Sequence, residues 1–245
     1  MAESMKSLAG QVVVVMGGSA GIGLETARQA GAAGARVIIT GRDRDRLEKA
    51  AAEVGAESAV TLDMYDPAEL EALFADLPQQ LDHLLVGGSG PFYAPLPELD
   101  LAQAERFMSQ HVVGSLRIAR LCIGRVRAGG SLTFISGTGA RRPGVGLMIA
   151  AIATAAQSAI VANAAVEIAP IRVNTVAAGF VDTPLSARLL GDQLEDRRAE
   201  LRATLPIGRV VGPDDVAALV VHLMTNGALT GATYDIDGGQ QLVSR

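Results

Sequence analysis

The stretch from Val12 to Gly23 reads VVVVMGGSAGIG, an apolar run that leads directly into a glycine-rich turn. The apolar run predicts a buried strand, and a helical pattern follows the turn. Gly17 permits a tight turn, Gly21 lets the backbone approach a phosphate, and Gly23 lets the helix pack on the strand. The helix amino terminus then offers free N–H groups to an anion. The stretch therefore predicts a strand–turn–helix unit that binds a dinucleotide pyrophosphate; a glycine turn without a ligand is the simpler alternative.

Strand and helix patterns alternate along the rest of the chain. The expected strands are Val12–Met16, Arg36–Thr40, Ala59–Leu62, Leu81–Val86, Ser131–Ser136, Ile171–Val176 and Thr233–Ile236. The expected helices are Gly21–Ala32, Asp43–Val54, Pro67–Ala75, Asp100–Arg127, Leu147–Ala169 and Pro213–Met224. Repeated strand–helix units with right-handed crossovers predict an α/β, Rossmann-like, doubly wound parallel sheet with helices on both faces. We expect residues 1–245 to form one domain.

Composition narrows the classes of function. Hydrophobic residues make up 49% of the chain, with a mean hydropathy of +0.30, which is enough apolar surface for a large core. A net charge of −5 argues against nucleic acid as a partner, because nucleic acid favours a basic face. The single cysteine, Cys122, excludes an internal disulfide, and no signal-peptide pattern precedes the first strand. We therefore expect a cytoplasmic protein. We expect no metal site.

Residues 143–166 contain no charged side chain, and this stretch is long enough to suggest a transmembrane helix. Alanine predominates, and Thr154, Gln157 and Asn163 interrupt the stretch. A helix that is apolar on nearly every face more often lies in a core or a subunit interface. We therefore expect no membrane span and predict a homodimer or homotetramer.

The second expected strand ends in Gly41-Arg42, where an NAD site would need a carboxylate for the ribose 2′-hydroxyl. A cation there suits a 2′-phosphate instead, so the sequence predicts NADP(H). Arg42 as an ordinary surface arginine is the alternative. Asp63, just past the third strand, is placed to accept a hydrogen bond from the adenine amino group or to cap a turn.

Residues 184–206 interrupt the strand–helix rhythm with a charged, helical segment. The segment follows the sixth strand at the carboxyl end of the sheet, where open α/β sheets carry their ligand crevice. It is expected to be a lid over the site or, alternatively, a solvated surface excursion.

Together these motifs make the chain resemble the short-chain dehydrogenase/reductase family, particularly its ketoacyl-reductase-like members. The glycine loop and Asp63 match the family pattern, although Met16 replaces the usual Thr. The other matching stretches are Leu81–Gly90, Ile171–Asn174, Gly179–Pro184, Pro206–Arg209, Pro213–Ala217 and Tyr234–Gly239. The resemblance covers nearly the whole chain. It implies that the cofactor contacts are Gly17, Ser19, Gly21, Ile22, Gly23, Arg42, Asp63, Met64, Gly88, Val181 and Thr183.

The chain departs from the family at the residues that carry its chemistry. The resemblance places the family's Tyr at Ala150, its Lys at Thr154 and its Asn at His111. Its Ser falls on Gly137, directly after Ser136. Hydride transfer to a carbonyl needs an acid that protonates the oxygen, and a nearby lysine makes the tyrosine a stronger acid. Alanine and threonine provide neither function.

The absence of the Tyr–Lys pair does not depend on how the chain is aligned with the family. The only lysines are Lys6 and Lys49, and the only tyrosines are Tyr65, Tyr93 and Tyr234, so no Tyr-x-x-x-Lys pair exists. Removing a positioned general acid typically lowers the rate by on the order of 10²–10⁴-fold.

Two residues are candidates to replace the missing acid. His111 has a side chain whose ordinary pKa suits acid–base chemistry, although a structural or interface histidine is the plainer interpretation. Tyr93 follows the fourth strand and lies near the expected crevice, although packing alone explains it.

Four further side chains invite a functional interpretation. Arg141 and Arg142 follow the fifth strand at the crevice end and could bind an anionic ligand or face solvent. His83 and His222 are expected at the surface or at an interface.

Three hypotheses follow. In the first, the chain is a non-catalytic NADP(H) binder that senses the cofactor or binds a partner. In the second, it is an oxidoreductase with a rebuilt site around His111 that acts on a small carbonyl or hydroxyl substrate. In the third, it is a structural subunit that assembles with an active paralogue. Intact cofactor motifs beside a missing tetrad favour the first.

Overall fold

The computed structural model describes residues 7–88, 90–141 and 143–243. Within these residues seven strands form one parallel sheet in the order β3-β2-β1-β4-β5-β6-β7. The strands are β1 (Val12–Met16), β2 (Arg36–Gly41), β3 (Ser58–Thr61), β4 (Leu81–Val86), β5 (Val126–Gly137), β6 (Arg172–Ala178) and β7 (Thr233–Ile236). The predicted doubly wound sheet is confirmed. The strand order reverses between β1 and β4, which leaves a crevice at the carboxyl ends of these strands.

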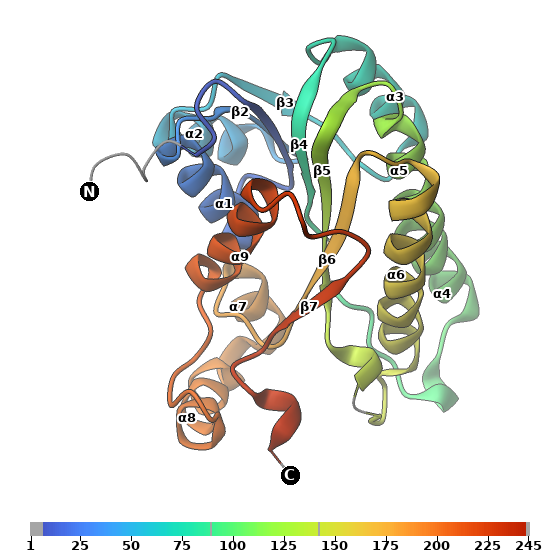
Figure 1. Cartoon of the computed structure of the whole chain (residues 1–245). Coiled ribbons are helices and arrows are strands. Elements are labelled where there is room, and N and C mark those ends of the chain that lie inside the picture. Colours follow the sequence, from blue (N-terminus) through green and yellow to red (C-terminus); the bar gives the residue numbers. More distant parts are fainter. Residues whose placement is uncertain (1–6, 89, 142, 244–245) are drawn as a thin grey trace.

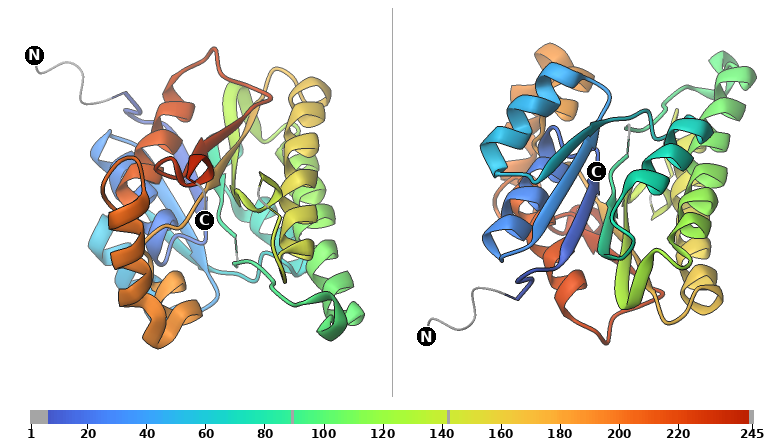
Figure 2. Two further views of the ribbon diagram at one scale, coloured as in Figure 1. Left: turned by 90° about the horizontal axis from the view of Figure 1, so that it is seen from below. Right: turned by 90° about the horizontal axis from the view of Figure 1, so that it is seen from above.

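Helices cover both faces of the sheet (Figures 1 and 2). One face carries α1 (Gly21–Ala32), α2 (Arg44–Val54) and α9 (Pro213–Thr225); the other carries α3 (Pro67–Asp76), α4 (Leu101–Met108), α5 (Gly114–Cys122) and α6 (Met148–Glu167). Side chains of a strand alternate between faces, so Val13 and Val15 of β1 join the first core layer and Val14 and Met16 the second. Burial on both sides explains the unbroken apolar run of β1.

The prediction of one α-helix over Asp100–Arg127 is wrong in two respects: the segment is not α-helical throughout, and it ends before Arg127. Instead, α4 runs into a single π-helical turn at Ser109–Val113, and α5 then ends at Cys122. The next strand, β5, begins at Val126, before its predicted start, because Val126 pairs with Leu81 of β4. Strand pairing therefore overrides a local helical pattern here. The other predicted boundaries agree within about two residues.

His83 contradicts the expectation of a surface or interface histidine, since its side chain is only 1% exposed. Its Nδ1 lies 2.8 Å from Ser131 Oγ, and its Nε2 lies 2.7 Å from Oε1 of Gln11. The amide oxygen of Gln11 can only accept, so Nε2 carries the ring proton and Nδ1 accepts from the serine hydroxyl. Burial, with a smaller contribution from Arg172, lowers the pKa of His83 to about 4. His222 is exposed, as expected.

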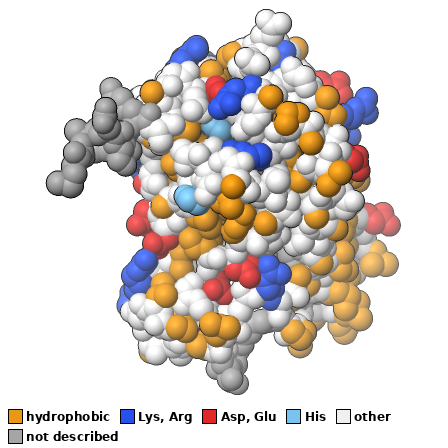
Figure 3. Space-filling model, in the orientation of Figure 1, with side chains coloured by type: hydrophobic (Ala, Val, Ile, Leu, Met, Phe, Trp, Pro, Cys, Tyr) orange, Lys and Arg blue, Asp and Glu red, His pale blue; other side chains and the backbone are white. Residues whose placement is uncertain are grey.

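The outer face of α6 is not covered by the sheet. By length and composition, α6 is the one helix among the described residues that could cross a membrane. In the structure, 33% of its most apolar stretch is buried. Ile160 and Val161 pack inward, whereas Ile152 and Val166 are exposed. Figure 3 shows hydrophobic side chains gathered along the side that α4 and α6 occupy in Figure 1. The described residues leave this apolar face of α6 uncovered.

Acidification from pH 6.5 toward pH 4 should destabilise the protein through His83. The unfolded side chain has a pKa near 6.5 and the folded one near 4, so between these values only the unfolded chain binds the proton. Stability that is present above pH 6.5 is therefore lost as the pH falls, by roughly 3 kcal/mol at most. Urea unfolding at pH 7 and pH 5 measures the loss.

His83→Gln removes the titrating group and should flatten this pH dependence. The exposed His222→Gln is the matched control and should leave it unchanged. An equal pH dependence in His83→Gln and the wild type would assign the acid sensitivity to other groups.

Candidate active site

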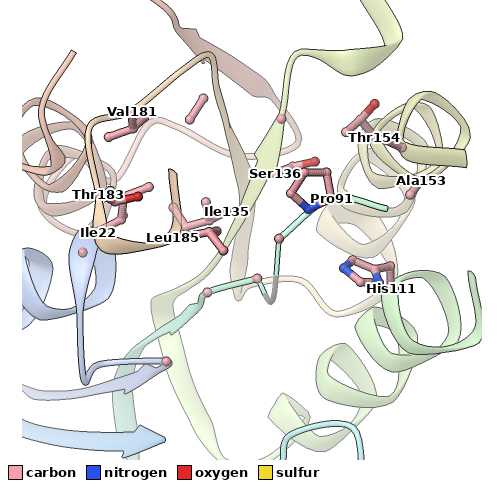
Figure 4. A pocket seen from close by; sticks show the side chains of 18 of the residues that line it. Ile22, Pro91, His111, Ile135, Ser136, Ala153, Thr154, Val181, Thr183 and Leu185 are labelled. Carbon is pink, nitrogen blue, oxygen red and sulfur yellow. The ribbon is translucent and has the colours of Figure 1, made fainter. Parts of the chain in front are cut away.

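A cleft of about 720 Å³ opens at the carboxyl ends of the strands, where β1 and β4 part. Every residue that the sequence assigned to the cofactor lines it: Gly17, Ser19, Gly21, Ile22, Gly23, Arg42, Asp63, Met64, Gly88, Val181 and Thr183. So do the residues at the family's four chemical positions, His111, Gly137, Ala150 and Thr154, and Ser136 directly before Gly137. The fold thus brings both sets to one space. Figure 4 shows Ile22, Val181 and Thr183 on one side of this space, and His111, Ala153 and Thr154 on the other.

The glycine loop has the geometry of a phosphate cradle. Gly17 has a φ of 82°, and a Cβ atom on Gly23 would lie 2.2 Å from the carbonyl oxygen of Gly17, so only glycine fits at position 23. The amino terminus of α1 has no side-chain cap and no acidic residue in its first turn. Its N–H groups therefore remain available to an anion in the cleft. The residues present fit a dinucleotide pyrophosphate.

Two arginines lie at the end of β2. Arg42 and Arg46 both line the cleft, and Nε of Arg46 donates to Ser19 Oγ over 3.3 Å. Sequence analysis missed Arg46, which lies in the first turn of α2 (Arg44–Val54), four residues after Arg42. Asp63 also lines the cleft, and its Oδ1 accepts from the N–H of Tyr65 over 3.1 Å. Asp63 thus caps a turn while facing the expected adenine end.

Residues 184–206 form α7 (Pro184–Leu190), a short 3₁₀ turn and α8 (Leu194–Thr204) beside the cleft. Leu185 and Arg188 line the cleft. At the start of the segment, a Cβ on Gly21 would lie only 3.3 Å from Cγ2 of Thr183, so the segment meets the glycine loop. An ion pair of 2.5 Å between Asp182 and Arg198 ties α8 to the start of α7. This is the placement that a lid requires.

The chemical end of the cleft offers few protons. Ala150 has no functional group, and Thr154 Oγ1 donates to the carbonyl oxygen of Ala151 over 3.0 Å, so its proton is already used within α6. Ser136 lines the cleft beside Gly137. A Cβ on Gly137 would lie 3.6 Å from Thr154 Cγ2, an ordinary contact, so this position has room for a serine that the chain does not use.

His111 lies on the π-helical turn between α4 and α5 and faces the cleft. Its Nδ1 lies 2.9 Å from the carbonyl oxygen of Phe107, and its ring stacks on the Phe107 ring with centroids 3.8 Å apart. The centroid of the Tyr65 ring lies 5.7 Å from that of the His111 ring. A carbonyl can only accept, so Nδ1 carries the proton of the neutral ring and Nε2 has a free lone pair. Burial lowers the pKa of His111, although the Phe107 carbonyl acts in the opposite direction. At neutral pH His111 is therefore an acceptor.

The remaining candidates are less suited to catalysis or anion binding. Tyr93 lines the cleft, and burial raises its pKa, which makes it a weaker acid than a free phenol. Arg141 forms a two-pronged ion pair with Asp235, through Nε at 2.9 Å and Nη2 at 2.5 Å. Its guanidinium is thus engaged within the protein. Arg142 lies outside the described residues.

Sequence analysis singled out neither Ser115 nor Gln157, which also line the cleft. Ser115 follows His111 by four residues and Gln157 follows Thr154 by three, so helical spacing places each on the same helix face as a residue already identified. That spacing was the available signal.

Comparisons with known proteins agree with this geometry. The family model described as enoyl-(acyl carrier protein) reductase matches residues 17–241. The cis-4-hydroxycyclohexanecarboxylate dehydrogenase of Sinomonas cyclohexanicum is 31% identical over 97% of this chain and 99% of its own. The reductase/Diels–Alderase MalC of Malbranchea aurantiaca superposes with a TM-score of 0.90 at 25% identity, over 97% of this chain and 99% of MalC.

A further solved structure, that of BdcA in complex with NADPH, superposes with a TM-score of 0.84 at 26% identity. The match covers 95% of each chain. The similarity therefore extends over the whole fold, and it includes a protein that holds NADPH.

Proposed function

This chain belongs to the short-chain dehydrogenase/reductase family, and we propose that it is an NADP(H)-binding member with little or no activity as an ordinary carbonyl reductase. The observation that carries the proposal is the contrast between the two ends of one cleft. The loop end has free helix N–H groups and two arginines, whereas the chemical end has Ala150 and Thr154 at the positions of the acid and its lysine. Cofactor sensing or partner binding fits such a site.

A nicotinamide cofactor fits the residues that line the cleft. The amino terminus of α1 would hold the pyrophosphate, and Arg42 with Arg46 would hold the 2′-phosphate. When bound, NADPH supplies hydride chemistry, and this chain supplies position and charge. The NADPH-bound relatives support NADP(H) over NAD(H).

A rebuilt enzyme around His111 is the second candidate, because relatives of this chain carry the names of dehydrogenases. The geometry of His111 supports it weakly: the ring proton lies on Nδ1 and is held by Phe107. Donation from Nε2 needs the imidazolium, which burial disfavours. MalC is named a Diels–Alderase as well as a reductase, so this fold also serves reactions other than carbonyl reduction.

NADPH should bind more tightly than NADH. Arg42→Ala should weaken NADPH binding by roughly 10- to 100-fold, the effect of losing a charge-assisted hydrogen bond to the 2′-phosphate, and should leave NADH binding unchanged. Titration calorimetry with both cofactors measures this. Arg44→Ala is the matched control, because Arg44 pairs with Glu48 and does not line the cleft. Equal affinities for the two cofactors would contradict the assignment.

The purified protein should not oxidise NADPH appreciably with ketones, aldehydes or ketoacyl thioesters. Hydride arrival leaves an alkoxide, and Ala150 and Thr154 stand where the family has the phenol and its lysine; none of the described residues that line the cleft is a lysine. The absorbance of NADPH over a substrate panel tests this. The combined variant Ala150→Tyr/Thr154→Lys/Gly137→Ser/His111→Asn is the gain-of-function control.

Three results separate the hypotheses. Turnover by the wild type that vanishes in His111→Ala would establish the rebuilt enzyme. Turnover only by the combined variant supports the non-catalytic binder. If both are silent while NADPH binds, the cleft has changed beyond the four positions, and a sensing or scaffold role gains support.

The protein should be a homodimer or homotetramer in solution. The exposed apolar side chains Leu116 and Ile123 of α5 and Ile152 and Val166 of α6 would be buried by a second copy. Light scattering at micromolar concentration measures the state. Ile152→Glu should produce monomers, whereas Val145→Glu, in a loop and already 90% exposed, should not. A monomer that assembles only with an active relative would favour the structural-subunit hypothesis.

A further inference from the structure

The last part of the described chain turns back against the loop that follows β6. Residues 237–241 come directly after β7, and we call them the C-terminal turn; Gln240 of this turn lines the cleft. Residues 179–183 come directly after β6, and we call them the β6 loop; its Val181 and Thr183 line the cleft as well (Figure 4). The fold therefore joins the end of the described chain to one wall of the cleft.

The C-terminal turn is held in shape by its own first residue. Asp237 is only 8% exposed, and its carboxylate accepts from the N–H of Gly239 over 2.9 Å and from the N–H of Gln241 over 3.0 Å. Gly238 and Gly239 have φ values of 65° and 85°, which favour glycine. Gln240 thus extends from a turn whose backbone is fixed on both sides of it.

Gln240 contacts the β6 loop through a hydrogen bond to its backbone. The N–H of Phe180 donates to Oε1 of Gln240 over 3.1 Å. The two segments approach closely beside this bond: a Cβ atom on Gly179 would lie 2.6 Å from Cβ of Asp237 and 2.7 Å from Oε1 of Gln240. Glycine alone therefore fits at position 179 without displacing the C-terminal turn.

The β6 loop is held on both sides of Val181. Before Val181, the N–H of Phe180 bonds to the side chain of Gln240. After Val181, the N–H of Asp182 donates to the carbonyl oxygen of Val211 over 3.0 Å. The second bond is between backbone groups, so only the first can be removed by a substitution that leaves the backbone unchanged.

The topology of the sheet indicates which half of the cofactor the β6 loop would meet. The strands lie in the order β2-β1-β4-β5-β6. With the pyrophosphate at the amino terminus of α1, directly after β1, and the 2′-phosphate at Arg42 and Arg46, after β2, the adenine half lies on the β2 side. The other half then extends over β4 and β5 toward β6. The nicotinamide half is therefore the one within reach of the β6 loop.

We propose that Gln240 is a positioning residue for the nicotinamide half of NADP(H). Its amide oxygen holds Phe180, and through Phe180 it keeps the β6 loop ordered as one wall of the cleft before the cofactor arrives. A loop that is already ordered does not have to lose conformational entropy on binding. The inference rests on the proposed function, because it assumes that NADP(H) binds. It adds a residue outside the matching stretch Tyr234–Gly239, which ends one position before Gln240.

Two ligands separate the two halves of the cofactor: NADPH, and 2′-phospho-ADP-ribose, which lacks the nicotinamide. Calorimetry of the wild type with both ligands comes first and tests the proposed function. Gln240→Met removes the acceptor and keeps the approximate length of the side chain. It should weaken NADPH binding by roughly three- to tenfold, the effect of one hydrogen bond, and should leave 2′-phospho-ADP-ribose binding unchanged.

Gln80→Met is the matched control. Gln80 is exposed, directly precedes β4 at the end of the sheet opposite the cleft, and does not line the cleft. This variant should bind both ligands as the wild type does.

Two further measurements separate positioning from a role in folding. The fluorescence of bound NADPH reports the surroundings of the nicotinamide ring, and its enhancement should be smaller in Gln240→Met. Hydrogen exchange at the Phe180 amide, measured without cofactor, should be faster in the same variant. Gln240→Glu keeps an acceptor oxygen at this position and should restore both signals.

An equal loss of affinity for both ligands in Gln240→Met would make Gln240 a structural residue and overturn the proposal, as would unchanged NADPH binding. A wild type that binds NADPH no more tightly than 2′-phospho-ADP-ribose would also overturn it, while the proposed binding of NADP(H) would stand. A wild type that binds neither ligand would overturn the proposed function and this role of Gln240 together.

Discussion

The approach of α1 to the turn after β1 is the contact on which the site depends. With a side chain at position 23, the helix could not sit where its backbone now lies against the carbonyl of Gly17. This closeness aims the free N–H groups of α1 into the cleft. It also places Gly21 against Thr183, and so sets the position from which residues 184–206 continue along the cleft. One backbone contact thereby links the first strand of the chain to a segment more than 150 residues later.

The two ends of the cleft differ in charge and in hydrogen-bonding character. Among the described lining residues, Arg42 and Arg46 follow β2, and Arg188 and Arg197 lie on α7 and α8, where Arg197 pairs with Glu200; the one acid in this set is Asp63. Such a concentration of positive charge matches a phosphorylated dinucleotide. The other end has a neutral imidazole, a threonine whose proton is engaged and an alanine. The residues suited to the cofactor and the positions of the family's chemistry thus form two separate sets within one cleft.

The sequence alone predicted the sheet and the loop because both depend on local signals: apolar runs of strand length and glycines at fixed spacing. The absence of a Tyr-x-x-x-Lys pair also follows from the sequence, since it needs only a count of residues. It failed where distant pairing decides the outcome. The start of β5 depends on Leu81 of β4, and the burial of His83 depends on Ser131 and Gln11. The orientation of His111 was equally beyond reach, because it follows from a π-helical turn and from a carbonyl on the preceding turn.

The π-helical turn at Ser109–Val113 has a further consequence for the helix that follows. Such a turn holds one more residue than an α-helical turn, so it offsets everything after it by about 100° around the helix axis. With the offset, Ser115 and Ile118 face the cleft while Leu116 lies 51% exposed on the outside. Without the offset, Ser115 and Leu116 would be rotated about the helix axis relative to α4. The number of residues in this turn, more than their identity, therefore determines which side of α5 faces the cleft.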